Sequence, residues 1–193
     1  MLWKMATQIE VTKKLFTVDE YHRMGEAGIF GPEERVELIE GEILQMSPIG
    51  IRHAACVNRA NKLLITRLQD RAIVSIQNPV TLDKYSEPQP DILILKPRDD
   101  FYVTTGHRPS DVLLMIEVSD STLRYDTRRK VPLYAATGIP EVWVEDLKND
   151  VILVYRELSG KTFQTTFERR SGETIASLAF PDVPFAVNDL LGI

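Results

Sequence analysis

The sequence has 193 residues, of which 44% are hydrophobic and 26% are charged, and this is the composition of an ordinary globular protein. A chain of this length buries roughly 70% of its unfolded surface in one core, so a single domain is the default expectation. The formal net charge of −5 argues against bulk electrostatic attraction to nucleic acid, and any DNA contact must rest on a local basic patch.

The chain carries no pattern typical of export or membrane insertion. Residues 1–10 contain no apolar run of signal-peptide length, and the longest aliphatic runs elsewhere, such as 112–116, are far too short to span a bilayer. The single cysteine, Cys56, cannot form an intrachain disulfide. We therefore expect a cytoplasmic protein with no membrane partner, in which residues 1–16 form an N-terminal extension and residues 17–193 form one domain.

The N-terminal third contains two helix signals and one hairpin signal. Thr17 and Glu20 have the spacing of a capping box and predict a short helix over 17–24. Apolar residues on both sides of Gly41 predict two strands joined by a tight turn. Beyond this hairpin the apolar positions fall on one helical stripe, which predicts a helix over about 51–70.

The remainder of the chain is rich in strand patterns. The runs 91–95 and 112–118 are almost continuously apolar, which suits strands that are covered on both faces. A helix over 126–137 should end at Gly138, and Pro132 should either kink this helix or lie in its opening turns. Strands are expected, in chain order, over residues 73–82, 91–95, 112–118, 142–147, 151–157 and 162–168.

Two acidic residues stand at the ends of the apolar strands. Asp91 opens one strand directly after Pro90, and Glu117 follows the apolar run of the other. Carboxylates are seldom buried without a partner or a metal ion. Because Mg²⁺ is usually bound by one or two protein carboxylates together with water and substrate phosphate, both residues are candidate metal ligands. Lys130, on the following helix, could stabilise charge on a transition state if its stripe faces the sheet.

A purely structural interpretation of the same residues stays open. An Asp at a strand start is more often a turn former or a cap, and a Glu at a strand end is more often solvated or paired with arginine. The basic run Arg124, Arg128, Arg129 and Lys130 could form a local patch for nucleic acid, but it could equally be a solvated helix face or a set of ion-pair partners.

The ordered set of motifs resembles a known family. It comprises Pro90-Asp91, Glu117-Val118-Ser119, Asp126, Lys130, Tyr134, Trp143, His53 and the segments 37–42, 46–48 and 138–141. The set is similar to the bacterial Uma-type restriction endonuclease family of the PD-(D/E)xK nuclease superfamily, from about residue 17 to residue 155. The resemblance implies an α/β (α+β), restriction-endonuclease-like fold: a mixed β-sheet flanked by helices, with extra antiparallel strands. It also implies that adjacent strands bring the two acids together around Mg²⁺ or Mn²⁺.

The sequence departs from the superfamily's usual motif at one position. Ser119 stands where that motif has lysine, two residues after the second acid. Related families carry this lysine on the next helix, and the resemblance implies that Lys130 takes its role. Glu37 also matches an acidic residue near this active site; it could orient a metal-bound water, or it could be an exposed strand carboxylate.

Four further residues have more than one interpretation. His53 could contact a phosphate or transfer a proton, although such a histidine more often caps a helix. Gln77 could reach the same site, although a cross-strand hydrogen bond explains it as well. We expect Tyr134 and Trp143 to be packing residues.

Two main functions from different classes follow. The first is a metal-dependent endonuclease that hydrolyses phosphodiester bonds of DNA; a different phosphate ester is a variant of it. Its catalytic residues would be Asp91, Glu117, Lys130, Glu37 and His53, and the first two would also bind the metal ion. The second is a catalytically inactive nuclease-fold domain that binds nucleic acid or protein, since a fold does not guarantee chemistry. A homodimer is an option, because the strands within 151–167 could offer an edge for pairing.

Overall fold

The structure, a computed structural model, describes residues 12–193, so the predicted N-terminal extension, residues 1–16, lies mostly outside the described part of the chain. A six-stranded mixed sheet has the strand order β3-β4-β5-β6-β7-β8. Within it β5 and β6 pair in parallel, and the other neighbours are antiparallel. The strands are β3 (Ile73–Ile76), β4 (Ile92–Leu95), β5 (Val112–Ser119), β6 (Val142–Asp146), β7 (Val151–Ser159) and β8 (Thr162–Arg170).

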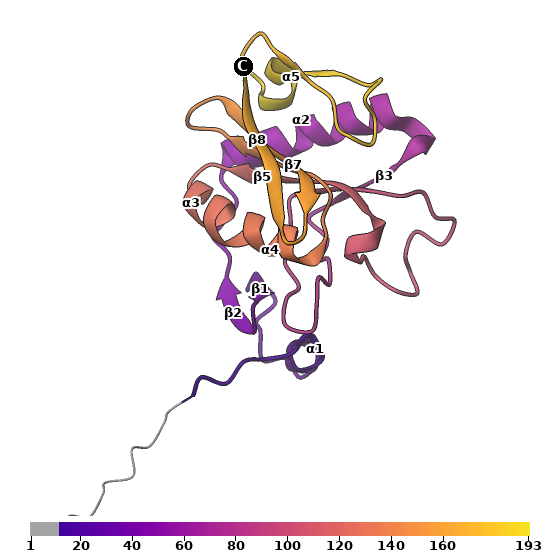
Figure 1. Ribbon diagram of the computed structural model, residues 1–193. Coiled ribbons are helices and arrows are strands. Elements are labelled where there is room, and N and C mark those ends of the chain that lie inside the picture. Colours follow the sequence, from indigo (N-terminus) through magenta and orange to yellow (C-terminus); the bar gives the residue numbers. More distant parts are fainter. Residues whose placement is uncertain (1–11) are drawn as a thin grey trace, which may run out of the picture.

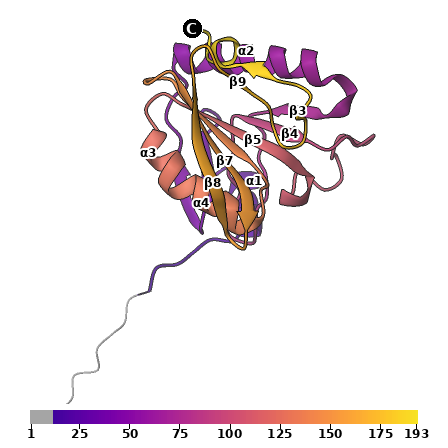
Figure 2. The ribbon, with the colours of Figure 1, turned by 45° about the horizontal axis from the view of Figure 1, so that its top comes forward.

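Helices cover both faces of this sheet (Figures 1 and 2). On one face lie α2 (Ile51–Leu68) and the C-terminal helix α5 (Val187–Leu191). The other face is covered by α3 (Leu123–Tyr125), a π-helical turn over Asp126–Lys130, and α4 (Val131–Thr137). The mixed sheet with flanking helices confirms the predicted fold class.

The central strand β5 contributes to two hydrophobic cores, because successive side chains of a strand point to opposite faces. Ile116 and Val118 pack with α2 in one core. Met115 packs with Tyr134 of α4 in the other. Such burial on both faces is what its nearly continuous apolar run predicts. Within residues 12–193 no helix is long and apolar enough to cross a membrane.

A hairpin and a helix lie beyond the sheet, on the side away from α2 (Figure 1). The hairpin pairs β1 (Val36–Ile39) with β2 (Glu42–Gln45) around Gly41, whose φ is +79°. The helix α1 (Val18–Glu26) begins at Thr17 with the predicted capping box. Both elements confirm the sequence prediction. Smaller elements are 3₁₀ turns over Gln69–Arg71 and Pro109–Asp111, and the paired strands β9 (Thr174–Ile175) and β10 (Phe185–Ala186).

The strand predicted over 73–82 is too long. It ends at Ile76 because Gln77 has a φ of 50°, which turns the chain out of the sheet. Asp91 lies directly before β4 rather than on it. The strands β7 and β8 each run two residues further than predicted.

The helix predicted over 126–137 begins a turn earlier and is not α-helical throughout. Its π-helical turn widens the helix immediately before Pro132, which lies in the first turn of α4. A proline ring without an N–H is tolerated there, which confirms the second of the two placements predicted for Pro132. Gly138 ends the helix with a left-handed φ of +92°, as predicted.

Candidate active site

A cavity of about 450 Å³ opens where β4 begins and β5 ends. The hairpin, the first turn of α2 and the π-helical turn form its other walls. The structure brings all five predicted catalytic residues to this cavity, from four separate elements and the segment before β4. They are Glu37, His53, Asp91, Glu117 and Lys130.

Strand pairing puts the two predicted metal ligands next to one another. Ile92 pairs with Ile116 across β4 and β5, so the next positions outward at this end are Asp91 and Glu117. The backbone N–H of Val118 donates to Oδ2 of Asp91 at 2.9 Å. This bond ties the Asp91 carboxylate to the end of β5.

Asp91 has two side-chain partners as well. Nε2 of His53 lies 3.1 Å from Oδ2 of Asp91, and Nε2 of Gln77 donates to Oδ1 at 3.3 Å. The contact with Asp91 raises the pKa of His53, although burial opposes it. Because Gly50 is the N-cap of α2, the helix-cap interpretation of His53 is wrong. His53 instead orients Asp91 from the α2 side of the cavity.

Glu117 is almost fully buried, with 3% of its surface exposed. Its Oε1 accepts a hydrogen bond from the Tyr134 hydroxyl at 2.5 Å and lies 3.4 Å from Nζ of Lys130. Burial raises the pKa of Glu117 to about 8; Lys130 opposes this shift, and the charges of Asp126 and Asp91 add to it. The expectation that Tyr134 is only a packing residue is therefore incomplete, since it is buried and also holds Glu117.

Lys130 lies between two buried carboxylates. Its Nζ is 3.1 Å from Oε2 of Glu37 and 3.4 Å from Oε1 of Glu117, and its side chain is only 5% exposed. Burial alone would lower the pKa of Lys130, but Glu117, Glu37 and Asp126 outweigh it and raise the pKa above its usual value. The helix stripe that carries Lys130 thus faces the sheet, the condition on which its predicted role depended.

Glu37 is buried as well, so its interpretation as an exposed strand carboxylate is wrong. Besides Lys130, its Oε2 accepts the backbone N–H of Gln89 at 3.3 Å. Glu37 therefore holds Lys130 in place from the β1 side of the cavity.

Asp126 lines the cavity, although no role was predicted for it from the sequence. Its Oδ2 accepts hydrogen bonds from the hydroxyls of Ser119 and Thr122, each at 2.6 Å. Burial raises its pKa. Ser119, which replaces the lysine of the usual motif, thus anchors this acid. The sequence pattern that could have predicted a place for Asp126 in the site is its spacing of four residues from Lys130, because this spacing puts both residues on one helix face.

The basic run after Thr122 does not form one patch. Arg129 pairs with Glu42 at 2.5 Å and with Glu40 at 3.3 Å, whereas Lys130 points into the cavity. Arg124 and Arg128 are exposed. In this run, therefore, Arg129 is an ion-pair partner and Lys130 is a site residue. Arg124 and Arg128 belong to a solvated helix face.

The donor set fits an open magnesium or manganese site rather than a closed cage. Within residues 12–193 no three His, Cys, Asp or Glu side chains converge as a metal-binding group. Mg²⁺, however, commonly uses only one or two protein carboxylates and completes its octahedron with water and substrate phosphate. Asp91 and Glu117 offer such hard oxygen ligands, and both contacts of Glu117 go to Oε1, which leaves Oε2 for a cation.

Comparison with known proteins gives a consistent result. The family model Uma2, described as "Putative restriction endonuclease", matches residues 18–188. The fold is similar to that of a solved "putative nuclease belonging to DUF820" from Anabaena variabilis ATCC 29413, with a TM-score of 0.70 over 92% of this chain and 98% of that one. At 18% sequence identity, this likeness concerns the fold alone. No curated protein matches the chain.

Proposed function

The chain belongs to the Uma2 family of restriction-endonuclease-like proteins, and from this premise we propose that it hydrolyses phosphodiester bonds of DNA with a bound Mg²⁺ or Mn²⁺ ion. The observation that supports the proposal best is the meeting of Asp91, Glu117 and Lys130 in one cavity at the ends of the central strands. This inventory, two acids and a cation, is the one that metal-assisted phosphodiester hydrolysis requires.

Each residue has a distinct role in this proposal. Asp91 and Glu117 would hold the ion, which when bound polarises the phosphodiester and lowers the pKa of an attacking water. Lys130 stabilises the negative charge that develops on the phosphoryl oxygens. His53 positions Asp91, and Glu37 positions Lys130, through the contacts at 3.1 Å described above.

The proposal is tested by nicking of supercoiled plasmid DNA with and without Mg²⁺ or Mn²⁺. The informative variants are Asp91→Asn and Glu117→Gln, because each keeps the shape of its side chain and removes its negative charge. Glu117→Gln keeps an oxygen for both contacts of Oε1, whereas Asp91→Asn keeps an oxygen for the contacts of Oδ2 and loses the hydrogen bond from Gln77. We expect cutting only with a divalent ion, and a loss of about 100-fold or more in either variant, the scale seen when a group that stabilises the transition state is removed.

A matched control is Asp182→Asn, which removes a carboxylate that pairs with Arg71 outside the cavity and should leave cutting unchanged. Metal-dependent cutting that survives both site variants would overturn this assignment of ligands. Lys130→Ala is less informative, because the removal of a buried cation leaves Glu37 and Glu117 uncompensated and costs about 3–5 kcal/mol of stability.

A second candidate function is that of a nuclease-fold domain that binds nucleic acid or protein without cutting. Two observations favour it: the net charge of −5, and the pairing of Lys130 with both Glu37 and Glu117, which already neutralise its charge. Isothermal titration of the protein with Mg²⁺ and Mn²⁺ distinguishes the two candidates. Absence of both metal binding and cutting would support the non-catalytic domain, whereas turnover of RNA or nucleotides with DNA left intact would redirect the proposal to another phosphate ester.

A further inference from the structure

The charges that line the cavity are unevenly paired. Five carboxylates face it, against two permanent cations, Arg35 and Lys130. Lys130 is already held between Glu37 and Glu117. A phosphate group that enters the cavity therefore needs a cation whose charge is not already neutralised, because it otherwise meets mostly negative charge.

Arg35 is fixed at the rim of the cavity by the hairpin. It directly precedes β1, and residues two apart in an extended chain point to the same side, so Arg35 and Glu37 both line the cavity. Its backbone carbonyl accepts the N–H of Met46 at 2.8 Å, which continues the pairing of the hairpin by one step. The backbone that carries the guanidinium is thus held in register.

The partner of Arg35 is a neutral amide. Nη2 of Arg35 donates to Oε1 of Gln89 at 3.3 Å. The amide of Gln89 has a defined orientation, because its Nε2 donates to the backbone carbonyl of Gln77 at 2.6 Å. Throughout residues 12–193, no carboxylate oxygen lies within 4.0 Å of the Arg35 guanidinium. The hydrogen bond to Gln89 therefore orients the guanidinium of Arg35 and, within this part of the chain, leaves its positive charge unpaired.

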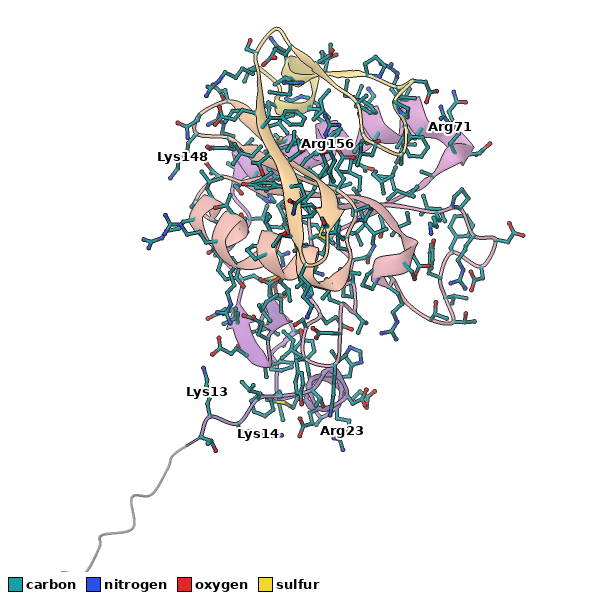
Figure 3. The ribbon with its side chains drawn as sticks, viewed as in Figure 1. Lys13, Lys14, Arg23, Arg71, Lys148 and Arg156 are labelled. Carbon is teal, nitrogen blue, oxygen red and sulfur yellow. The ribbon has the colours of Figure 1, made fainter. Side chains whose placement is uncertain are left out.

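The exposed basic side chains that Figure 3 labels lie on different parts of the molecule. Lys13, Lys14 and Arg23 lie around α1, Arg71 lies at the end of α2, and Lys148 lies on another side of the molecule. Lys13, Lys14 and Arg71 are also paired with carboxylates. Of the two lysine and arginine residues that line the cavity beside the candidate metal ligands, Arg35 is the one that no carboxylate in the described part of the chain pairs.

We propose that Arg35 binds a phosphodiester group of the nucleic-acid backbone at this cavity. The inference rests on the proposed function and adds the residue that holds the substrate beside the reacting group. The planar guanidinium presents five N–H donors in a fork that matches two phosphate oxygens, and Gln89 uses one of them. In this proposal Lys130 stabilises the charge that develops during the reaction, whereas Arg35 holds the phosphate that enters the cavity.

The test is the affinity of the protein for a fluorescently labelled DNA duplex, measured by anisotropy without divalent ions at several salt concentrations. Arg35→Gln should weaken binding by about 10- to 100-fold, the value of a hydrogen bond to a charged group. It should also reduce the slope of log affinity against log salt by about 0.9, the value of one lost phosphate contact. Arg35→Lys should keep the slope but lose affinity, because it keeps the charge and lacks the fork.

The matched control is Arg67→Gln. It removes the same charge from an arginine that also hydrogen-bonds a neutral oxygen, the carbonyl of Pro184 at 3.1 Å, and that does not line the cavity. The control should bind like the wild type. Unchanged affinity and slope in Arg35→Gln, or an equal loss in Arg67→Gln, would overturn the inference. If Arg35→Gln does not fold, an unchanged affinity of Arg35→Lys would overturn it as well.

Binding of an RNA duplex of the same sequence, measured in the same way, distinguishes failure of this inference from failure of the proposed DNA endonuclease function. Arg35-dependent binding of RNA alone would support the inference and contradict DNA as the substrate. Loss of cutting in Asp91→Asn together with wild-type binding and cutting by Arg35→Gln would contradict the inference and leave the proposed function standing. No binding of either duplex by the wild type would overturn the inference, whatever the nicking assay shows.

Discussion

At the scale of single residues, Glu145 on β6 is a buried acid that the proposed chemistry does not use. It is 0% exposed, its Oε2 accepts a hydrogen bond from the thiol of Cys56 at 3.0 Å, and its Oε1 has no partner within residues 12–193. Burial raises its pKa from 4.5 to about 7. The folded protein therefore keeps this proton over a range in which the unfolded chain has already lost it.

The sign of the resulting pH dependence follows from linkage. Between about pH 4.5 and pH 7 the folded state binds more protons than the unfolded state, so stability falls as the pH rises. Glu145→Gln removes this contribution and keeps an acceptor for Cys56. We expect the variant to be more stable than the wild type by up to about 3 kcal/mol at about pH 8, and similar to it near pH 4.5.

Urea unfolding of both proteins at the two pH values measures the difference. Glu117, whose raised pKa acts in the same direction, is present in both, so it does not affect the comparison. A destabilised Glu145→Gln variant at the higher pH would show that the ionised carboxylate is compensated by a group that the contacts of Glu145 do not reveal.

At the scale of elements, the β1–β2 hairpin carries Arg35 and Glu37 to the cavity, and Gly41 sets its position. A Cβ at Gly41 would lie 2.6 Å from Cβ of Leu15 and 3.1 Å from its backbone Cα. The backbone of Gly41 is also bonded on both sides, to the carbonyl of Tyr85 and the N–H of Phe16. The turn is therefore packed against its neighbours as well as left-handed.

Gly28→Ala is a matched control for Gly41→Ala. Gly28 has a similar φ of +72° but no atom within 4 Å of an added Cβ, so its substitution carries the left-handed penalty of about 1 kcal/mol alone. We expect Gly41→Ala to be clearly more destabilising than Gly28→Ala in thermal unfolding, and to weaken DNA binding as well. Equal losses in the two variants would mean that the segment around Leu15 shifts without cost.

At the scale of the whole molecule, the two hydrophobic cores share the strands of one sheet. Ile116 and Met115 are neighbours on β5 and belong to opposite cores, so β5 cannot leave the sheet without exposing both. We propose on this basis that residues 17–193 unfold as one domain. Far-UV circular dichroism and tryptophan fluorescence should give coincident urea transitions, whereas two separated transitions would indicate two folding units.

Much of the architecture was predictable from local pattern. The apolar runs of β4 and β5, the capping box at Thr17 and the turn at Gly41 are signals within a few residues of one another, and the structure confirms each. Local pattern failed at Gln77, because a positive φ in a residue other than glycine has no clear sequence signature.

The sequence by itself determined that Asp91 directly precedes one apolar strand and that Glu117 follows the apolar run of its neighbour, and resemblance to a family pointed to Lys130. Only the tertiary structure decided that Glu37 is buried against Lys130, that Tyr134 holds Glu117, and that Arg35 has a neutral partner. These contacts join elements far apart in the chain, and their geometry depends on which face of each strand and helix packs inward. The periodicity of a sequence predicts that a helix or strand has an inward face. Which side chains of different elements then meet is decided by how those elements pack together.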